Sequence, residues 1–294
     1  MTDGEATEFV RARLAKLDAR LCDAQQRLSV AERGDTPAGD ARADEALHDL
    51  RVAVRTIRVV LRLSRPLFGR RNADSVRAPF TELGALTSPL RDEEVFEATI
   101  AAVAFADPHL DAYRAQRRER EQQLRRALLE TLRTGRIERA RNMLELLLRM
   151  PQPLRRHQPL WPFAEGAVAG ALARVAKLVP PPSTDVAVLH ALRIAYKQLR
   201  YTVELFSGVL SEERMAIAKA AKQQQAVLGD IHDLDVACAA LTAATSATPT
   251  APLPAAVVLR LVGQLQARRA LLLPELYAER EAVERAAQRS SDGS

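Results

Sequence analysis

The segment LHDLRVAVRTIRVVLR at residues 47–62 recurs 142 residues later as LHALRIAYKQLRYTVE at residues 189–204. A second pair of segments, SPLRDEEV at 88–95 and GDIHDLDV at 229–236, matches at an offset of 141. Two matches at nearly the same offset indicate an internal duplication. A duplication constrains the architecture more than any single motif does.

The chain is predicted to be all-α. Glycine accounts for only 12 of 294 residues and aromatic residues for 4%, which is too few for most β-sandwiches or barrels. Alanine, leucine and arginine are abundant and favour helices, and apolar residues recur with a helical period in most long segments. This periodicity predicts helices over residues 5–33, 41–65, 72–87, 92–106, 109–134, 136–149, 160–179, 185–208, 211–229, 233–245 and 255–285.

A proline-rich segment at residues 150–162 divides the chain near its middle. We expect two similar halves, at residues 5–150 and 159–285, which together form one domain over residues 5–285. The polar residues at 286–294 are predicted to be a disordered tail.

The first repeated segment places its basic residues on one face of a helix. At about 100° per residue, His48 and the arginines that follow it fall within an arc of roughly 80°. This first stripe comprises His48, Arg51, Arg55, Arg58 and Arg62, and the second stripe comprises His190, Arg193, Lys197 and Arg200. Apolar residues flank the first stripe on both sides, so we expect it to line a groove or an interface between helices.

A run of basic residues on a helix can also be a solvated face. Such a face normally mixes charges, with Glu placed four residues before Lys or Arg. No acidic residue occurs from Arg51 through Arg65, so like charges repel along this helix. An anionic ligand would relieve that repulsion, and the net charge of +6 also favours an anionic partner. We therefore interpret the stripes as an anion-binding site.

The sequence also predicts a cellular location. Cys22 and Cys238 are the only cysteines and form no CxxC pair, so we expect neither a disulfide framework nor a zinc site. The first residues carry early acids and no apolar signal-peptide core, and no run of about 18 apolar residues predicts a membrane span. These features favour the cytoplasm.

Residues 189–206 (LHALRIAYKQLRYTVELF) followed by residues 222–236 (KQQQAVLGDIHDLDV) resemble the CHAD family, the conserved-histidine α-helical domains. A weaker copy of the same pattern occupies residues 47–69 and 90–95. The pattern H-x-x-R-x-x-x-[RK]-x-x-R thus occurs twice, each time with an acidic block downstream. The resemblance extends over residues 5–285.

This resemblance implies an all-helical fold of two pseudo-symmetric, four-helix-bundle-like halves. It also implies that inorganic polyphosphate binds in a basic pore or groove lined by the residues of both stripes. Tyr201 matches the family's RY pair, and Lys222 matches a basic position before an LG turn. We interpret Arg114, Arg118 and Arg125 as a candidate extension of this track, although the glutamates between them fit a solvated face equally well.

The first copy departs from the family pattern in two places. Its downstream block, LTSPLRDEEV, lacks the LG before the expected turn, and Gly84 lies too early to replace it. Arg62 and Glu204 occupy equivalent positions in the two copies with opposite charge. The two halves therefore cannot be electrostatically identical.

Catalysis is not expected. His232 and Asp233 superficially match the HD pair of metal-dependent phosphohydrolases, but the remaining candidates, His109 and His157, lack ligand spacing. We instead interpret Asp233 and Asp235 as helix caps or as partners of basic residues. The sequence contains no phosphate-binding GxxxxGK loop and no nucleophile elbow, and we expect neither a cofactor nor a metal.

Inorganic polyphosphate is therefore the expected partner. The alternative is a granule-associated adaptor or scaffold whose helical surface binds another protein, and in either case the protein could reside on polyphosphate or other storage granules. Nucleic acid is not expected as the ligand because the stripes carry almost no aromatic residues for stacking bases.

Overall fold

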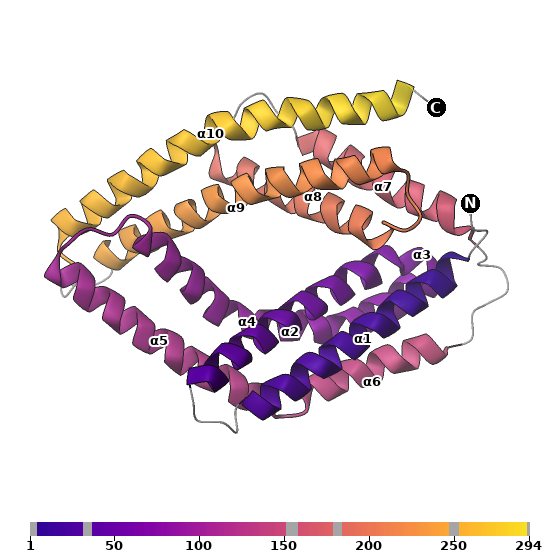
Figure 1. The fold of residues 1–294 in the computed structure, drawn as a ribbon, viewed down its shortest axis with the longest axis horizontal. Coiled ribbons are helices and arrows are strands. Elements are labelled where there is room, and N and C mark those ends of the chain that lie inside the picture. The colour runs from indigo at the N-terminus through magenta and orange to yellow at the C-terminus, as the bar shows by residue number, and fades with distance from the viewer. Residues whose placement is uncertain (1–4, 32–36, 151–157, 179–183, 247–252, 293–294) are drawn as a thin grey trace. The chain divides into compact units, whose positions relative to one another are not determined.

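The structure, a computed structural model, describes residues 5–31, 37–150, 158–178, 184–246 and 253–292. Within these ranges the chain is helical, and its only β contact is an isolated bridge between Glu5 and Pro159. The helices are α1 (Ala6–Ala31), α2 (Pro37–Leu63), α3 (Arg65–Phe68), α4 (Arg70–Ala101), α5 (Pro108–Leu132), α6 (Arg136–Arg149), α7 (Leu160–Leu178), α8 (Val186–Leu205), α9 (Glu212–Ser246) and α10 (Ala255–Asp292). The prediction of an all-α fold is confirmed (Figure 1).

The prediction of a break between two helices inside each of the segments 88–95 and 229–236 is wrong. Each block lies inside one uninterrupted helix, α4 in the first case and α9 in the second. Pro89 lacks an amide donor, but the hydroxyls of Thr87 and Ser88 both donate to the Gly84 carbonyl, at 3.0 and 3.1 Å, and reinforce that turn of α4. A single glycine such as Gly229 costs a helix only about 1 kcal/mol, so it does not end α9.

Two glycines with positive φ form the tight connections that the helices need. Gly69, at φ 84°, lies between α3 and α4, and Gly135, at φ 75°, lies between α5 and α6. A side chain at either position would strain the backbone. At the C-terminal end, α10 continues to Asp292 and so includes residues 286–292 of the segment that was predicted to be a disordered tail.

The chain forms two compact units, which do not coincide with the two halves expected from the sequence. The first unit comprises Met1–Ser88, Leu128–Ala167 and Leu205–Leu210, and the second comprises Pro89–Ala127, Val168–Glu204 and Ser211–Ser294. The first stripe, on α2, belongs to the first unit. The second stripe, on α8, belongs to the second.

In the first unit, α1 packs beside α2 (Figure 1). Their facing leucine and isoleucine side chains, including Leu14, Leu50 and Ile57, are fully buried. Phe206 is also fully buried, and its ring centroid lies 5.7 Å from that of Phe9 in a stacked arrangement. This apolar packing fixes the orientation of α2 and therefore the direction in which its basic face points.

In the second unit, α9 packs along α10 (Figure 1). A buried cluster contributed by α4, α5, α9 and α10 includes Phe96, Tyr113, Leu234 and Leu261. The side-chain amide of Gln224, also buried, donates to the Leu276 carbonyl at 3.2 Å. Among the residues that the structure describes, no helix is both long enough and apolar enough to cross a membrane.

Candidate anion-binding site

The first stripe lies along α2, next to the face that forms the core. Leu47, Leu50 and Ile57 are buried on that face, His48 is exposed, and the four arginines of the stripe are half-buried. Burying a guanidinium group costs free energy unless an opposite charge or hydrogen bonds compensate it. For Arg58, which has no carboxylate partner among the described residues, a bound anion would offset that cost.

Arg58 is the clearest case. Its Nη1 lies so close to Gly84 of α4 that a Cβ atom added there would approach it to 2.6 Å. Its Nε is buried without a hydrogen-bond partner, and no carboxylate pairs with Arg58 among the described residues. Burial lowers the pKa of Arg58, and the positive charge of Arg77 lowers it further. Arg58 is thus an uncompensated cation in contact with the protein interior.

The second stripe lies along α8 in the same way. His190 is exposed, and Arg193, Lys197 and Arg200 are half-buried. The Nε of Arg193 is buried without a hydrogen-bond partner and would lie 3.9 Å from a Cβ atom added at Gly229 of α9. The second stripe therefore rests on α9 much as the first stripe rests on α4.

The contacts between helices repeat with the sequence offset. Arg51 donates to the Thr87 carbonyl at 3.5 Å, and Arg193, its counterpart, lies against Gly229, which aligns with Ser88. Two positions further along each stripe, Arg58 lies against Gly84, and Arg200 donates to the side chain of Gln225 at 3.3 Å. Gly84 and Gln225 are themselves 141 residues apart. Each stripe thus meets equivalent or adjacent positions on the long helix that follows it.

The two stripes differ in charge compensation. The Nε of Arg200 lies 2.7 Å from the Glu204 carboxylate, one turn further along α8. Arg62 occupies the equivalent place in α2. Arg200 is therefore paired with an acid in the second unit. Arg58, its counterpart in the first unit, instead has the cationic neighbour Arg77.

Tyr201 and Lys222 have different environments. The Tyr201 ring is buried, and the Arg200 guanidinium lies 5.1 Å from its centroid, so the ring supports the arginine. Lys222 is exposed on α9. Its counterpart at the offset of 141 is Thr81 of α4, whose hydroxyl donates to the Arg77 carbonyl at 3.1 Å.

Two of the three arginines of the candidate extension on α5 face acidic partners. Arg114 pairs with Glu97 at 2.8 Å, and Arg125 lies 3.4 Å from Glu121. Arg118 is exposed, and its Nε donates to the Arg114 carbonyl at 3.3 Å. Because carboxylates already compensate Arg114 and Arg125, we leave this helix out of the proposed site.

His232 is a residue of the site that the sequence interpretation missed. Its Nδ1 lies 3.3 Å from the Nδ1 of His190, and the two ring centroids are 4.8 Å apart. Burial lowers the pKa of His232, and the nearby Arg193 and His190 lower it further, while Asp235 and Asp92 act in the opposite direction. In the sequence, the pattern HDLD indicated His232 only as a candidate metal ligand. Its contact with His190 depends on how α8 and α9 pack, which the sequence pattern does not specify.

The acidic residues beside His232 have separate roles. Asp235 forms an ion pair with Arg269 of α10 at 2.6 Å, which confirms the predicted pairing with a basic residue. Asp233 lies in the middle of α9 and caps no helix, and burial raises the pKa of its carboxyl group. Within the described residues, no group of three or more His, Cys, Asp or Glu side chains is arranged to hold a metal ion.

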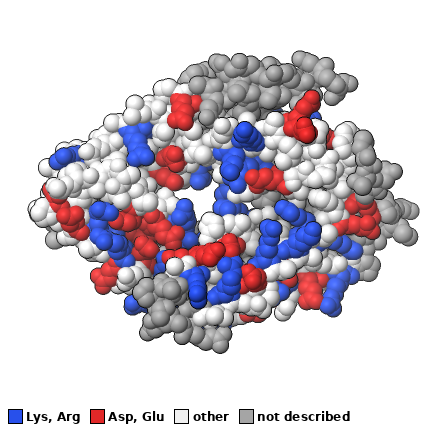
Figure 2. Space-filling view, viewed as in Figure 1, with Lys and Arg blue, Asp and Glu red and all other residues white. Residues whose placement is uncertain are grey.

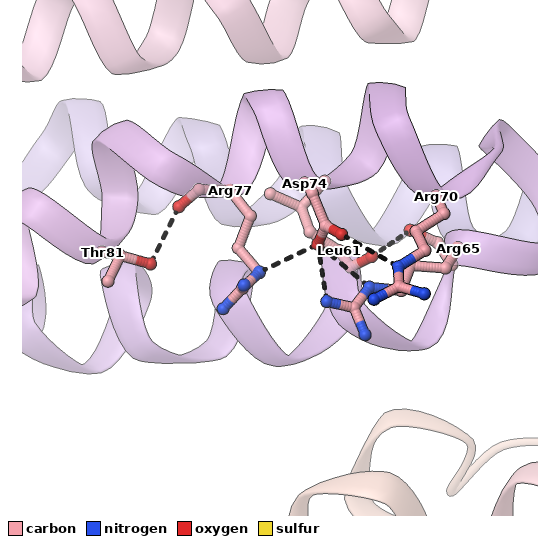
Figure 3. A network of polar contacts seen from close by, with 7 residues as sticks. Leu61, Arg65, Arg70, Asp74, Arg77 and Thr81 are labelled. Carbon is pink, nitrogen blue, oxygen red and sulfur yellow. Dashed lines mark hydrogen bonds and ion pairs between the residues drawn. The ribbon is translucent and has the colours of Figure 1, made fainter.

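Further arginines adjoin the first stripe at the start of α4. Asp74 accepts hydrogen bonds from Arg65 at 2.7 and 3.0 Å, and it lies 3.4 Å from Arg77 and 3.8 Å from Arg70 (Figure 3). The hydrogen bonds from Arg65 are the largest cause of the lowered pKa of Asp74. Residues 65–77 contain four arginines and one acid, and this excess was the available sequence signal. We call Arg65, Arg70, Asp74 and Arg77 the arginine cluster.

The net charge of +6 is not spread as a uniformly basic surface. On the face seen in Figure 2, acidic side chains lie among basic ones. The stripe on α2 and the arginine cluster are therefore local concentrations of positive charge. Such concentrations select for anions that make several simultaneous contacts.

The fold and the two matched stripes define an all-helical domain in which each compact unit carries a basic stripe that begins with a histidine. The family model of the CHAD domain matches residues 24–242. The chain therefore belongs to the CHAD family, as its sequence resemblance predicted.

Solved structures of other proteins share this fold. The crystal structure of the CHAD domain from the plant Ricinus communis has a TM-score of 0.72 and 24% identity, and the match covers 96% of this chain and 92% of that one. PptA from Streptomyces chartreusis has a TM-score of 0.64 and 17% identity, with 97% and 100% covered. At these identities the likeness establishes the fold alone. No curated protein matches the chain.

Proposed function

We propose that this CHAD chain binds inorganic polyphosphate at the stripes of α2 and α8, without catalysing a reaction on it. The observation that carries the proposal is the environment of Arg58. A half-buried arginine with a cationic neighbour and no carboxylate partner among the described residues destabilises the folded chain. A bound polyanion would compensate that charge.

The chemistry of the stripes suits a repeating phosphate polymer. Guanidinium groups form planar, bidentate contacts with phosphate oxygens, while Lys197 contributes a mobile point charge. The exposed His48 and His190 can donate hydrogen bonds to phosphate oxygens. Polyphosphate has no base edges, so its recognition depends on charge and hydrogen bonds, as these residues provide.

The test replaces His48, Arg51, His190 and Arg193 with alanine and measures retention on immobilised polyphosphate across a salt series. We call the magnitude of the negative slope of log affinity against log salt the salt slope. By analogy with single-stranded nucleic acid, each lost arginine contact should lower this salt slope by roughly 0.7. The two arginines together should therefore lower it by about 1.4. Circular dichroism should show that the variant remains helical, because all four side chains lie outside the buried core.

A matched control replaces Arg141 and Arg149 with alanine, which removes the same number of permanent charges, both from the first unit. Each of these arginines pairs with one acid, Asp18 and Glu145 respectively. The control should retain the wild-type slope. Equal slopes for the stripe variant, the control and the wild type would refute the assignment of the stripes. A phosphate-release assay with divalent metals tests the absence of catalysis.

A further inference from the structure

The arginine cluster holds more positive charge than its carboxylate can neutralise. Three arginines share the single carboxylate of Asp74, which leaves two positive charges in the cluster. Elsewhere in the same unit, Arg141 pairs with Asp18 one to one, through contacts of 2.8 and 3.0 Å. The Arg141–Asp18 pair carries no net charge, whereas the arginine cluster keeps an excess of positive charge.

Donor atoms remain available in the cluster. Arg65 directs its Nε and Nη2 at one oxygen of Asp74, while Arg77 and Arg70 approach the carboxylate through Nε alone (Figure 3). Each guanidinium carries five N–H donors. Among the described residues, the Nη atoms of Arg77 and Arg70 therefore have no hydrogen-bond partner, and Arg70 has a side-chain exposure of 85%.

The cluster also lies within electrostatic reach of the first stripe. The charge of Arg77 acts directly on Arg58, the uncompensated arginine of α2. Arg77 lies one turn before Thr81, the position at which the second copy carries Lys222. The first unit thus lacks the lysine of the second copy but has an arginine one turn away on the same helix.

From this arrangement we infer that Arg65, Arg70 and Arg77 form a further phosphate-binding subsite, continuous with the first stripe through Arg58. The inference rests on the proposed function and adds residues that lie outside both repeated helices. The ligand group is a phosphate with free oxygens, which belongs either to the polyphosphate chain held by the stripe or to a separate small phosphate.

The test compares Arg77→Gln with Arg141→Gln. Both substitutions remove one half-buried arginine that is paired with an aspartate in the first unit, with side-chain exposures of 31% and 28%. Affinity for long-chain polyphosphate, tripolyphosphate and orthophosphate is measured across a salt series. Arg77→Gln should lower the salt slope by roughly 0.7 and weaken binding several-fold, while Arg141→Gln should leave the slope unchanged.

The three ligands separate the two sources of phosphate. A lower slope for the long chain alone means that one chain spans the stripe and the cluster. A lower slope for the short phosphates as well means that the cluster binds phosphate independently. Identical slopes for Arg77→Gln and Arg141→Gln would overturn the inference, and failure of the wild type to bind any polyphosphate would instead refute the proposed function.

Arg70→Gln provides a second variant should Arg77→Gln unfold. Arg70 is highly exposed and lies 3.8 Å from Asp74, so its loss leaves the fold intact. It should lower the slope in the same direction. An unchanged slope in a folded Arg70→Gln protein would count against the subsite.

Discussion

Glu204 should weaken anion binding in the second unit, and replacing it with glutamine should strengthen that binding. Its carboxylate lies 2.7 Å from the Nε of Arg200, which also donates to Gln225. An anion that approaches Arg200 must therefore displace Glu204 or accept a negative charge beside it. Arg58, the counterpart in the first unit, meets no such acid among the described residues.

The size of the effect follows from the geometry. Glu204 is 41% exposed and Arg200 22% exposed, so the pair itself stabilises the fold by only about 0.5 kcal/mol. A carboxylate roughly 5 Å from a bound phosphate repels it by ~0.8 kcal/mol at the dielectric constant of water and by ~3 kcal/mol at an effective value of 20. A gain of ~1 kcal/mol, or about five- to tenfold in affinity, is therefore expected from Glu204→Gln.

The assay isolates the second stripe. Tripolyphosphate binding is measured by calorimetry in a protein whose first stripe carries Arg51→Ala and Arg58→Ala, with and without Glu204→Gln. The control is Glu213→Gln, which changes the net charge equally at an exposed position in the first turn of α9. Glu204→Gln should tighten binding five- to tenfold, and the control by less than about twofold.

The reciprocal change is Arg62→Glu in an otherwise intact chain. It places an acid one turn after Arg58, as in the second unit, and should weaken binding by about tenfold or more because it also removes a cation. The reasoning would be refuted if Glu204→Gln and Glu213→Gln had the same affinity, since Arg200 would then not meet the ligand.

Three further predictions concern stability and its relation to binding. Gly84→Ala should raise the melting temperature by about 2 °C through helix propensity, yet weaken polyphosphate binding several-fold, because the new Cβ displaces the Arg58 guanidinium. The lowered pKa of His232 means that its folded form resists protonation, so stability should fall as pH drops from about 6.5 towards that pKa; His232→Gln should flatten this decline in thermal melts. Phe206→Ala should remove about 3–5 kcal/mol of unfolding free energy, or about 10 °C in melting temperature, because the ring is fully buried against Phe9.

The helices were predictable because their causes are local. The period of Leu47, Leu50, Val54 and Ile57 specifies both the helix and its buried face, and all four side chains are buried. The helix breaks predicted inside α4 and α9 do not occur, for a related reason. A single proline or glycine weakens one turn, but packing on both sides of that turn holds a long helix together.

The sequence revealed the two stripes, but it did not reveal which groups on other helices contact their side chains. The opposite charges of Arg62 and Glu204 could be compared directly, and the pair of Arg200 with Glu204 lies within one helix at i,i+4. The contact of Arg58 with Gly84 and that of His190 with His232 join different helices. No periodicity within one helix contains that information.

The asymmetry between the stripes follows from where a duplicated helix is free to change. Leu50 and Leu192 are both buried at equivalent positions, and a charge at either would be severely destabilising. Arg62 and Glu204 are only half-buried, so exchanging a base for an acid there costs the fold little while it changes the field that an anion meets. An exchange of charge is therefore tolerated at this end of the stripe, where it should change anion affinity, whereas a charge is not tolerated at the buried apolar positions that orient the stripe.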